Sequence, residues 1–400
     1  MRLKDSRLLS PFALPLVLLT GCGPSNNDRH YTTPPPAATF AYAVSSVKNN
    51  IAGYSVSPST GALTQLTGFP ITTAIDLTAL AIDPLGKFVV TNESPGLVVY
   101  SINQTTGALT SASSTSITTA ESFGSFAFNP AGTLLVVSTL KEPDWDPPYQ
   151  GAPPPNPNPI YVFSVNRSSG SLTAVPGSPF AISSDASIAC CVAFNANSTM
   201  LYATDGHLLD AFSVDPTTGA LSPINSVPVT LTDFLTNSVE PSSLALDSAG
   251  GFIYLTGSGA NTIDAFSINP TTGALSAGPI STTADTAAAL ITLDPAHNLA
   301  FTSEASSPSS GSYTDIKTYS ISNGKLTNIS SISAPMSPQA LQLGPSSSFL
   351  YAAEDNAYLG SVGSTSQVAT YSIGAAGSLS PLATVPTVQW PSAFAIAQSQ

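Results

Sequence analysis

Apolar residues along the chain stand in short runs that are separated by glycine, proline, asparagine, aspartate and serine. One type of run ends in an Asx-type turn, as in residues 80–84 and 126–130, and a second type, such as 252–255 or 349–352, follows such a turn. Short apolar runs between turn residues predict strands, and the turn joins the first strand of a unit to the second.

A triplet of an aromatic residue, serine and an aliphatic residue recurs along the chain, at spacings of 46 to 63 residues. The seven triplets begin at Tyr54, Tyr100, Phe163, Phe212, Phe266, Tyr319 and Tyr371. Each is followed by a glycine and, two residues later, by a leucine, as in Asp215–Leu221, where Pro216 and Gly219 favour a tight turn. The pattern predicts a hairpin from the third strand to the fourth strand of each repeat.

Repeats of four strands and about 50 residues are typical of β-propellers. The first repeat lacks its innermost strand, and residues 394–397 near the C-terminus have the pattern of that missing strand. We therefore predict an all-β fold over residues 39–400: a seven-bladed β-propeller with four-stranded blades. The C-terminal strand joins the N-terminal blade, which closes the ring and removes an exposed sheet edge.

The first residues have the layout of a secretory signal, with Arg2, Lys4 and Arg7 before the apolar stretch 8–19. That stretch is too short to span a bilayer. It ends in Leu19-Thr20-Gly21-Cys22, which resembles the lipobox of bacterial lipoproteins; an uncleaved anchor with a chance cysteine is the alternative. The resemblance implies a signal peptide over 1–21 and lipidation of Cys22.

Residues 22–38 contain three consecutive prolines and predict a flexible tether. The resemblance then implies an exported protein of the bacterial cell envelope, attached to the membrane by its lipid and either periplasmic or exposed at the surface.

Charge excludes two classes of partner. The chain has 10 Lys+Arg against 23 Asp+Glu, a formal net charge of -13. It therefore offers no basic surface for nucleic acid or for anionic lipid headgroups.

Over residues 39–400 the repeats resemble those of the seven-bladed lactonase-like propellers, also known as the YVTN repeat family. Enzymes of that family cluster His, Arg and Glu on one face, so the resemblance implies a lactone hydrolase related to 6-phosphogluconolactonase. This chain departs from that pattern, because beyond the signal its arginines are Arg29 in the tether and Arg167 in a hairpin turn.

In a four-stranded blade, the loops from second to third strand and from fourth strand to the next blade lie on one side of the disc. Many acids fall in these loops, whereas Asp83, Asp215, Asp247 and Asp294 have the Asx and proline context of structural turns. The cationic or titratable partners expected on the acidic side are Lys48, Lys141 and His207. The acids could serve solubility alone, or could bind a cation such as calcium or a cationic ligand. The candidate cation ligands are Asp76, Glu93, Glu121, Asp185, Asp285, Glu304, Glu354 and Asp355.

His207 is the histidine placed on that side, and Asp205 could orient it as a general base. The alternative is an ordinary loop histidine. A phosphorylated sugar lactone fits an acidic face poorly, so a neutral lactone is the expected substrate if the protein is an enzyme.

Two further features stand out. Cys190 and Cys191 are adjacent at the start of an inner strand, where two buried thiols are favoured over a vicinal disulfide, and no zinc site is expected. The insertion 143–159, rich in proline with Trp145 and Tyr149, is either a stiff lid or docking arm or a disordered excursion.

The sequence favours a binding or scaffold module in the cell envelope over lactone hydrolysis, because the repeats are explained by architecture alone. A protein of the envelope or a glycan is the expected partner. No cofactor is required by the sequence, and calcium is the one that the acidic loops could bind.

The two hypotheses predict different effects of substitution. If the chain is a binding module, changing Asp205 and Glu121 abolishes cation binding; if it is an enzyme, His207→Ala abolishes acid release from lactones at constant pH. If neither change has an effect, both site assignments are wrong.

Overall fold

The computed structural model describes residues 38–398, apart from 75–76, 94–95, 118–121, 141–158, 183–190, 225–227, 238, 240, 248, 258–260, 286–287, 305–313 and 357–364. The predicted signal peptide, Cys22 and all of the predicted tether except Ala38 lie outside the described residues. So does the insertion 143–159, except for Pro159.

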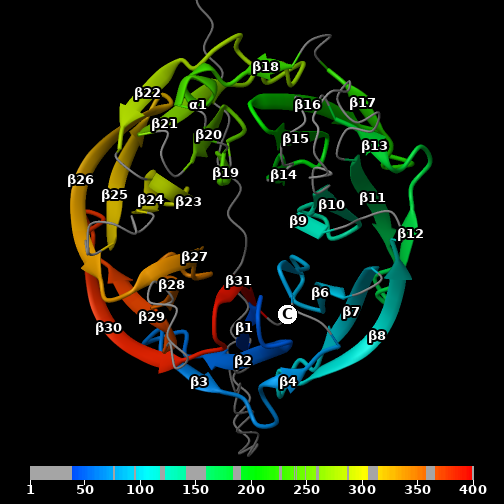
Figure 1. Cartoon of the computed structure of the whole chain (residues 1–400), viewed down its shortest axis with the longest axis vertical. Helices are drawn as coiled ribbons and strands as arrows, with labels where there is room; N and C mark the ends of the chain where they lie inside the picture. The colour runs from blue at the N-terminus through cyan, green and yellow to red at the C-terminus, as the bar shows by residue number, and fades with distance from the viewer. Residues whose placement is uncertain are drawn as a thin grey trace, which may run out of the picture. The chain divides into compact units, whose positions relative to one another are not determined.

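The strands form seven antiparallel sheets, each a blade of a ring (Figure 1). Blade 1 holds β31 (Pro391–Gln398), β1 (Thr39–Ser45), β2 (Asn50–Val56), β3 (Leu63–Gln65) and β4 (Ile71–Thr72). Blade 2 holds β5 (Leu80–Ile82), β6 (Phe88–Glu93), β7 (Gly96–Ile102) and β8 (Leu109–Ser116). Blade 3 holds β9 (Ser122–Phe128), β10 (Leu134–Leu140), β11 (Pro159–Val165), β12 (Leu172–Ala174) and β13 (Phe180–Ala181).

The remaining blades follow in chain order. Blade 4 holds β14 (Val192–Phe194), β15 (Met200–Asp205), β16 (Leu208–Val214), β17 (Leu221–Pro223) and β18 (Val229–Thr230). Blade 5 holds β19 (Ser243–Leu246), β20 (Phe252–Thr256), β21 (Thr262–Ser267) and β22 (Ser281–Ala284). Blade 6 holds β23 (Ala288–Asp294), β24 (Leu299–Glu304), β25 (Thr314–Ser322) and β26 (Lys325–Ala334). Blade 7 holds β27 (Ser337–Leu343), β28 (Phe349–Asp355), β29 (Ser366–Ile373) and β30 (Leu379–Pro386).

Four strands per blade is the predicted number; in blades 1, 3 and 4 the fourth strand is divided into two short pieces that both pair with the third strand. The described residues contain one short helix, α1 (Thr232–Asn237), in the connection from blade 4 to blade 5. No helix in the described part of the chain is both long and apolar enough to cross a membrane.

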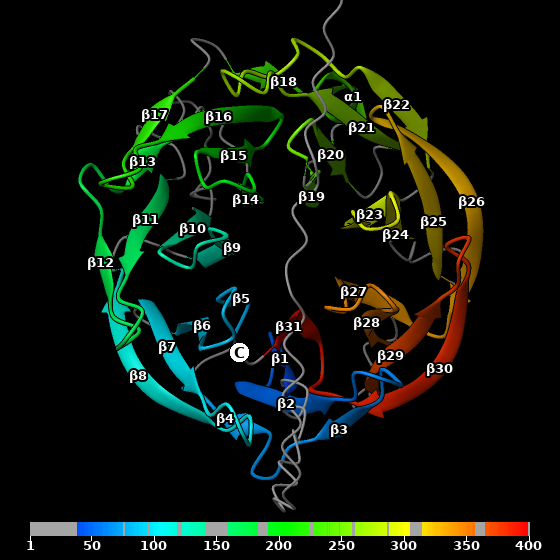
Figure 2. The same ribbon diagram turned by 180° about the vertical axis from the view of Figure 1, so that it is seen from behind.

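The ring closes where the sequence predicted. β31 pairs with β1, with Phe394 opposite Ala43 and Ala395 opposite Tyr42. The innermost strands contact one another all the way around, from β27 to β31 and from β31 to β5 (Figure 1, and from behind in Figure 2). Both ends of the described chain therefore lie in one sheet, so no blade is left with an unpaired inner strand.

The glycine after each triplet does more than make a turn. In all seven repeats it has a positive φ, from 69° to 79°. A Cβ built on it would come within 3.0 Å of a side chain at the start of the second strand of the preceding blade, as Gly107 would against Phe40. In three blades the carbonyl of this glycine also accepts a hydrogen bond from a buried tyrosine, such as the 2.7 Å bond from Tyr42 to Gly107. The repeated glycine thus fixes each blade against the one before it.

Replacing Gly107 with alanine tests this packing. The new Cβ would lie 2.5 Å from the Phe40 ring, whereas at Gly68, which also has a positive φ, it would meet nothing within 4 Å. Both variants carry the backbone strain, so the additional loss for Gly107→Ala measures the crowding, about 1–3 kcal/mol of unfolding free energy. Equal losses in chemical denaturation of the two variants would contradict the packing role.

Candidate functional site

The two sides of the ring differ in what they carry. Because neighbouring strands are antiparallel, the connections from second to third strand, such as 46–49, and those between blades, such as 387–390, end on one side, the loop face. The opposite side, the turn face, carries the Asx turns and the glycine turns. As predicted, Asp83 and Asp215 are structural there: Asp83 accepts hydrogen bonds from the backbone of Lys87 and Phe88, and Asp215 from that of Thr217 and Thr218.

Acids occupy one repeated position on the loop face. In four blades the second-strand residue that pairs with the serine of the triplet, as Leu299 pairs with Ser320, is followed five residues later by an acid. That position is held by Glu93, Asp205, Glu304 and Glu354. Four of the predicted candidates therefore occupy equivalent places at the ends of β6, β15, β24 and β28.

The loop face holds a cluster of opposite charges between blades 5 and 6. The Lys317 ammonium in β25 forms salt bridges with Asp285, which follows β22, and with Glu304 at the end of β24, with Nζ 2.6 Å from Glu304 Oε1. Tyr319 donates a hydrogen bond of 2.7 Å to Asp285, and Thr302 donates one of 3.2 Å. We call Lys317, Asp285, Glu304 and Tyr319 the Lys317 cluster.

The electrostatics of the Lys317 cluster fix its protonation. Burial by itself lowers the pKa of Lys317, but the hydrogen bonds to Asp285 and Glu304 and their negative charges outweigh burial, so its pKa lies above the ordinary value. Burial, followed by the bond to Asp285, raises the pKa of Tyr319 to about 12. Both groups are protonated near neutral pH. The side chains of Lys317 and Glu304 are 17% and 21% exposed, so these two members of the cluster reach solvent. The Asp285 side chain is fully buried.

Sequence reasoning placed Asp285 and Glu304 on this face correctly but missed Lys317 and Tyr319. The signal was present, because the lysine stands in β25 two residues before the triplet tyrosine. Residues two apart in a strand share a face, so Lys317 had to point the same way as Tyr319.

Among the candidates whose burial the structure describes, Glu354 is the least exposed. Its carboxylate is 0% exposed and accepts hydrogen bonds from Tyr371 (3.1 Å) and Gln367 (2.8 Å). Burial raises its pKa to about 7, and the two hydrogen bonds oppose the shift without cancelling it. The next residue, Asp355, is also buried and accepts a bond from Ser366.

Triplet tyrosines and acids are paired in three blades. Tyr100 donates a 2.5 Å hydrogen bond to Glu93, just as Tyr319 does to Asp285 and Tyr371 to Glu354. In blades 3, 4 and 5 the triplet begins with phenylalanine and has no such hydroxyl. The choice of tyrosine over phenylalanine is thus a sequence signal for a bound carboxylate, although Tyr54 donates to the carbonyl of Pro386 instead.

His207 lies in the two-residue turn between β15 and β16, on the loop face as predicted, and its carbonyl accepts a 2.7 Å hydrogen bond from Leu231. The backbone of Asp205 pairs with Leu208, but its side chain lies outside what the structure describes. The catalytic assignment of His207 and Asp205 stays a prediction.

The calcium hypothesis also stays a prediction. Asp76, Glu121, Asp185 and Lys141 lie outside the described residues. Within the part of the chain that the structure describes, no group of three or more His, Cys, Asp or Glu side chains could hold a metal ion.

The prediction of free thiols was wrong for Cys191, which is disulfide-bonded. The other cysteines of the chain, Cys22 and Cys190, lie outside the described residues. An exported protein in an oxidising compartment is the setting in which disulfides persist.

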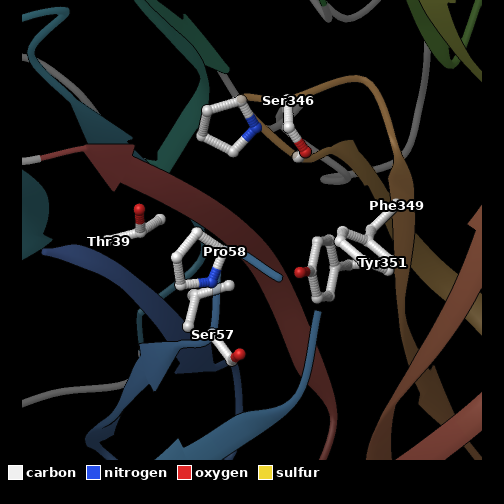
Figure 3. Close-up of a pocket in the computed structure, with 9 residues that line it drawn as sticks. Thr39, Ser57, Pro58, Ser346, Phe349 and Tyr351 are labelled. Atoms are coloured by element: carbon white, nitrogen blue, oxygen red, sulfur yellow. The ribbon is translucent and has the colours of Figure 1, made fainter. Parts of the chain in front are cut away.

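A small pocket of about 110 Å³ lies between blades 1 and 7 on the turn face. Figure 3 shows Tyr351 and Phe349 on one side of it, with Ser57, Pro58 and Thr39 on the other. The Tyr351 hydroxyl donates to the carbonyl of Gly61, and no acid or base lines the pocket. It holds packing residues rather than groups for chemistry.

One protein family matches the sequence. The family described as lactonase, 7-bladed beta-propeller, matches residues 15–142 and 159–309, which is more than half of the chain. No curated protein matches the sequence.

Solved structures with the same fold come from several bacteria. A candidate 6-phosphogluconolactonase of Bacteroides uniformis superposes with a TM-score of 0.70 at 18% identity, covering 91% of this chain and 100% of that one. The periplasmic gluconolactonase of Pseudomonas aeruginosa superposes with a TM-score of 0.68 at 15% identity, covering 90% and 99% of the two chains. At these identities the likeness shows the fold alone.

Glu354 predicts a pH dependence of stability. Its pKa is about 7 when folded and near 4.5 when unfolded, so between these values the folded state binds the extra proton. Its contribution is complete below pH 4.5 and is lost as the pH rises through about 7, by about 3 kcal/mol at 1.4 kcal/mol per pKa unit.

Unfolding with urea between about pH 4.5 and pH 8 measures this loss. Glu354→Gln keeps the shape of the side chain but cannot titrate, so its stability should fall less with pH than that of the wild type. Parallel curves for the two proteins would show that Glu354 ionises without cost.

Proposed function

Because the chain belongs to the lactonase family of seven-bladed β-propellers, we propose that it hydrolyses a lactone at the Lys317 cluster on the loop face. The observation that carries the proposal is the arrangement of Lys317 between two carboxylates, with the phenol of Tyr319 beside them and with Lys317 and Glu304 reaching solvent. A family match alone gives the architecture, so the site has to supply the chemistry.

The cluster has the parts that lactone opening requires. Water attacks the carbonyl carbon, the ring C–O bond breaks, and the product is a hydroxy acid. Glu304 accepts the proton of the attacking water and returns it to the ring oxygen as the C–O bond breaks, and the Lys317 ammonium donates a hydrogen bond to the oxyanion that forms. Asp285 holds the lysine in place and, together with Glu304, keeps it charged, while Tyr319 donates a hydrogen bond to Asp285.

A neutral lactone is the proposed substrate. The chain carries a formal net charge of -13, and Glu93 and Asp205 stand at the same position on the loop face as Glu304. A phosphorylated substrate would have to approach this negative surface, which is unfavourable, whereas an uncharged lactone meets no such barrier.

The comparisons favour hydrolysis over the binding or scaffold role that the sequence analysis ranked first. Export, the lipid on Cys22 and a location in the cell envelope remain part of the proposal, and they rest on the sequence of the first 22 residues.

Glu304→Gln tests the proposal with little change in shape. Acid release from a panel of neutral and phosphorylated lactones is followed at constant pH. The wild type should hydrolyse neutral lactones, and the variant should lose about 10²- to 10⁴-fold in kcat, the usual contribution of a general base.

Lys317→Met should lose activity as well, and circular dichroism checks that this variant still folds. Lys325→Met is the matched control, because Lys325 is exposed in the same blade but follows the glycine turn on the turn face. Absence of turnover in the wild type, or full activity in Glu304→Gln, would refute the proposed site.

A further inference from the structure

Trp390 has an unusual backbone and an exposed side chain. Six large hydrophobic side chains are exposed among the described residues, and Trp390, at 43%, is the aromatic one. Its φ is 51°, in the left-handed region, and Pro391 follows it. A bulky residue rarely adopts that conformation, and a following proline disfavours it further, so the surrounding structure must hold it there.

The contacts that hold Trp390 come from the closure of the ring. Ser46 donates its backbone N–H to the carbonyl of Trp390 at 3.2 Å, and the buried Ser45 hydroxyl donates to the carbonyl of Gln389 at 2.6 Å. Ser45 Oγ in turn accepts from the backbone of Val47 and Lys48. The hairpin of blade 1 and the connection from blade 7 are therefore locked together on the loop face.

The hairpin of blade 1, next to this connection, carries a second exposed apolar side chain. Val47 is 45% exposed, and Lys48 and Ser46 follow and precede it in the chain. Strained backbone that the fold over-determines is a feature of ligand-binding sites. In this protein the strained backbone of Trp390 leaves its indole ring exposed to solvent, next to the hairpin that carries Ser46 and Lys48.

We propose that Trp390 is the platform of a carbohydrate-binding site on the loop face, on which a neutral sugar ring stacks. This site is separate from the Lys317 cluster and does not depend on lactone hydrolysis. A pyranose has one face of C–H groups, which packs on an indole, and a rim of hydroxyls, which can bond to Ser46 and Lys48.

Other ligand classes fit less well. An anion or a nucleic acid is repelled by a chain of net charge -13. A cation that stacks on the indole meets the exposed Lys48 on the neighbouring hairpin. The apolar surface of Trp390 and Val47 is too small for a stable protein interface. A neutral ring matches both the size and the charge.

Isothermal titration calorimetry of the full-length protein with maltotriose, cellotriose and triacetylchitotriose tests the proposal. At least one of these sugars should bind with a Kd of about 1 mM or lower. Trp390→Ala should weaken binding by about tenfold or more, as loss of a stacking aromatic side chain does for nucleic-acid bases, and Trp390→Phe by less.

Leu235→Ala is the matched control, because Leu235 in α1 is 51% exposed on the same face and should leave the Kd unchanged. None of the three sugars carries a lactone, so the result does not depend on whether the protein hydrolyses lactones. No binding of any sugar, or equal binding by the wild type and Trp390→Ala, overturns the proposal. So does loss of self-association in Trp390→Ala by sedimentation, which would make the indole an interface between copies of the chain.

Discussion

The architecture depends on one repeated contact, the close approach of each turn glycine to the preceding blade. The glycine has a positive φ, and its Cα fits against a residue at the start of a second strand where no Cβ has room. Seven such contacts set each blade at the same relation to its neighbour. The pairing of β31 with β1 completes the ring, so the inner strands of all seven blades contact one another in a closed cycle.

Because of this contact, the residues of the turn face are more constrained than those of the loop face. The turn face has to preserve the glycine and Asx turns. Acids such as Asp83 and Asp215 accept hydrogen bonds there from backbone N–H groups of the same turn. The connections on the loop face do not make these contacts, and they differ in length and residue type from blade to blade. Charged residues are concentrated on the loop face. Lys317 is a charged residue within β25, a strand whose other buried side chains pack against neighbouring strands. Burial of such a charge is tolerated because Asp285 and Glu304 neutralise it.

The sequence was sufficient to predict the features that recur in every blade. The triplets, the turn glycines and the orphan strand 394–397 predicted seven blades and their closure, because these signals are local or recur seven times. The contact of Gly107 with Phe40 could not be predicted in the same way, since it joins residues 67 apart and depends on how blades are oriented.

The candidate site was predicted in part for a related reason. The order of strands is enough to place Glu304 and Asp285 on the loop face, because both stand at or near connections between strands. Their partner Lys317 lies inside β25, so its position in the sequence does not assign it to that face. The raised pKa of Glu354 comes from its burial in the folded blade, which the spacing of the repeats does not show, and the hydrogen bonds from Gln367 and Tyr371 oppose that shift. The disulfide of Cys191 likewise depends on geometry that the sequence does not carry.

The central claim is that chemistry takes place at the Lys317 cluster and not elsewhere on the ring. A crystal structure with a neutral lactam, which resembles the lactone but resists hydrolysis, tests it most directly. The account predicts that the lactam carbonyl oxygen lies within hydrogen-bond distance of Lys317 Nζ, with Glu304 beside the carbonyl carbon. A lactam bound in the turn-face pocket at Tyr351, or anywhere away from Lys317, would contradict it.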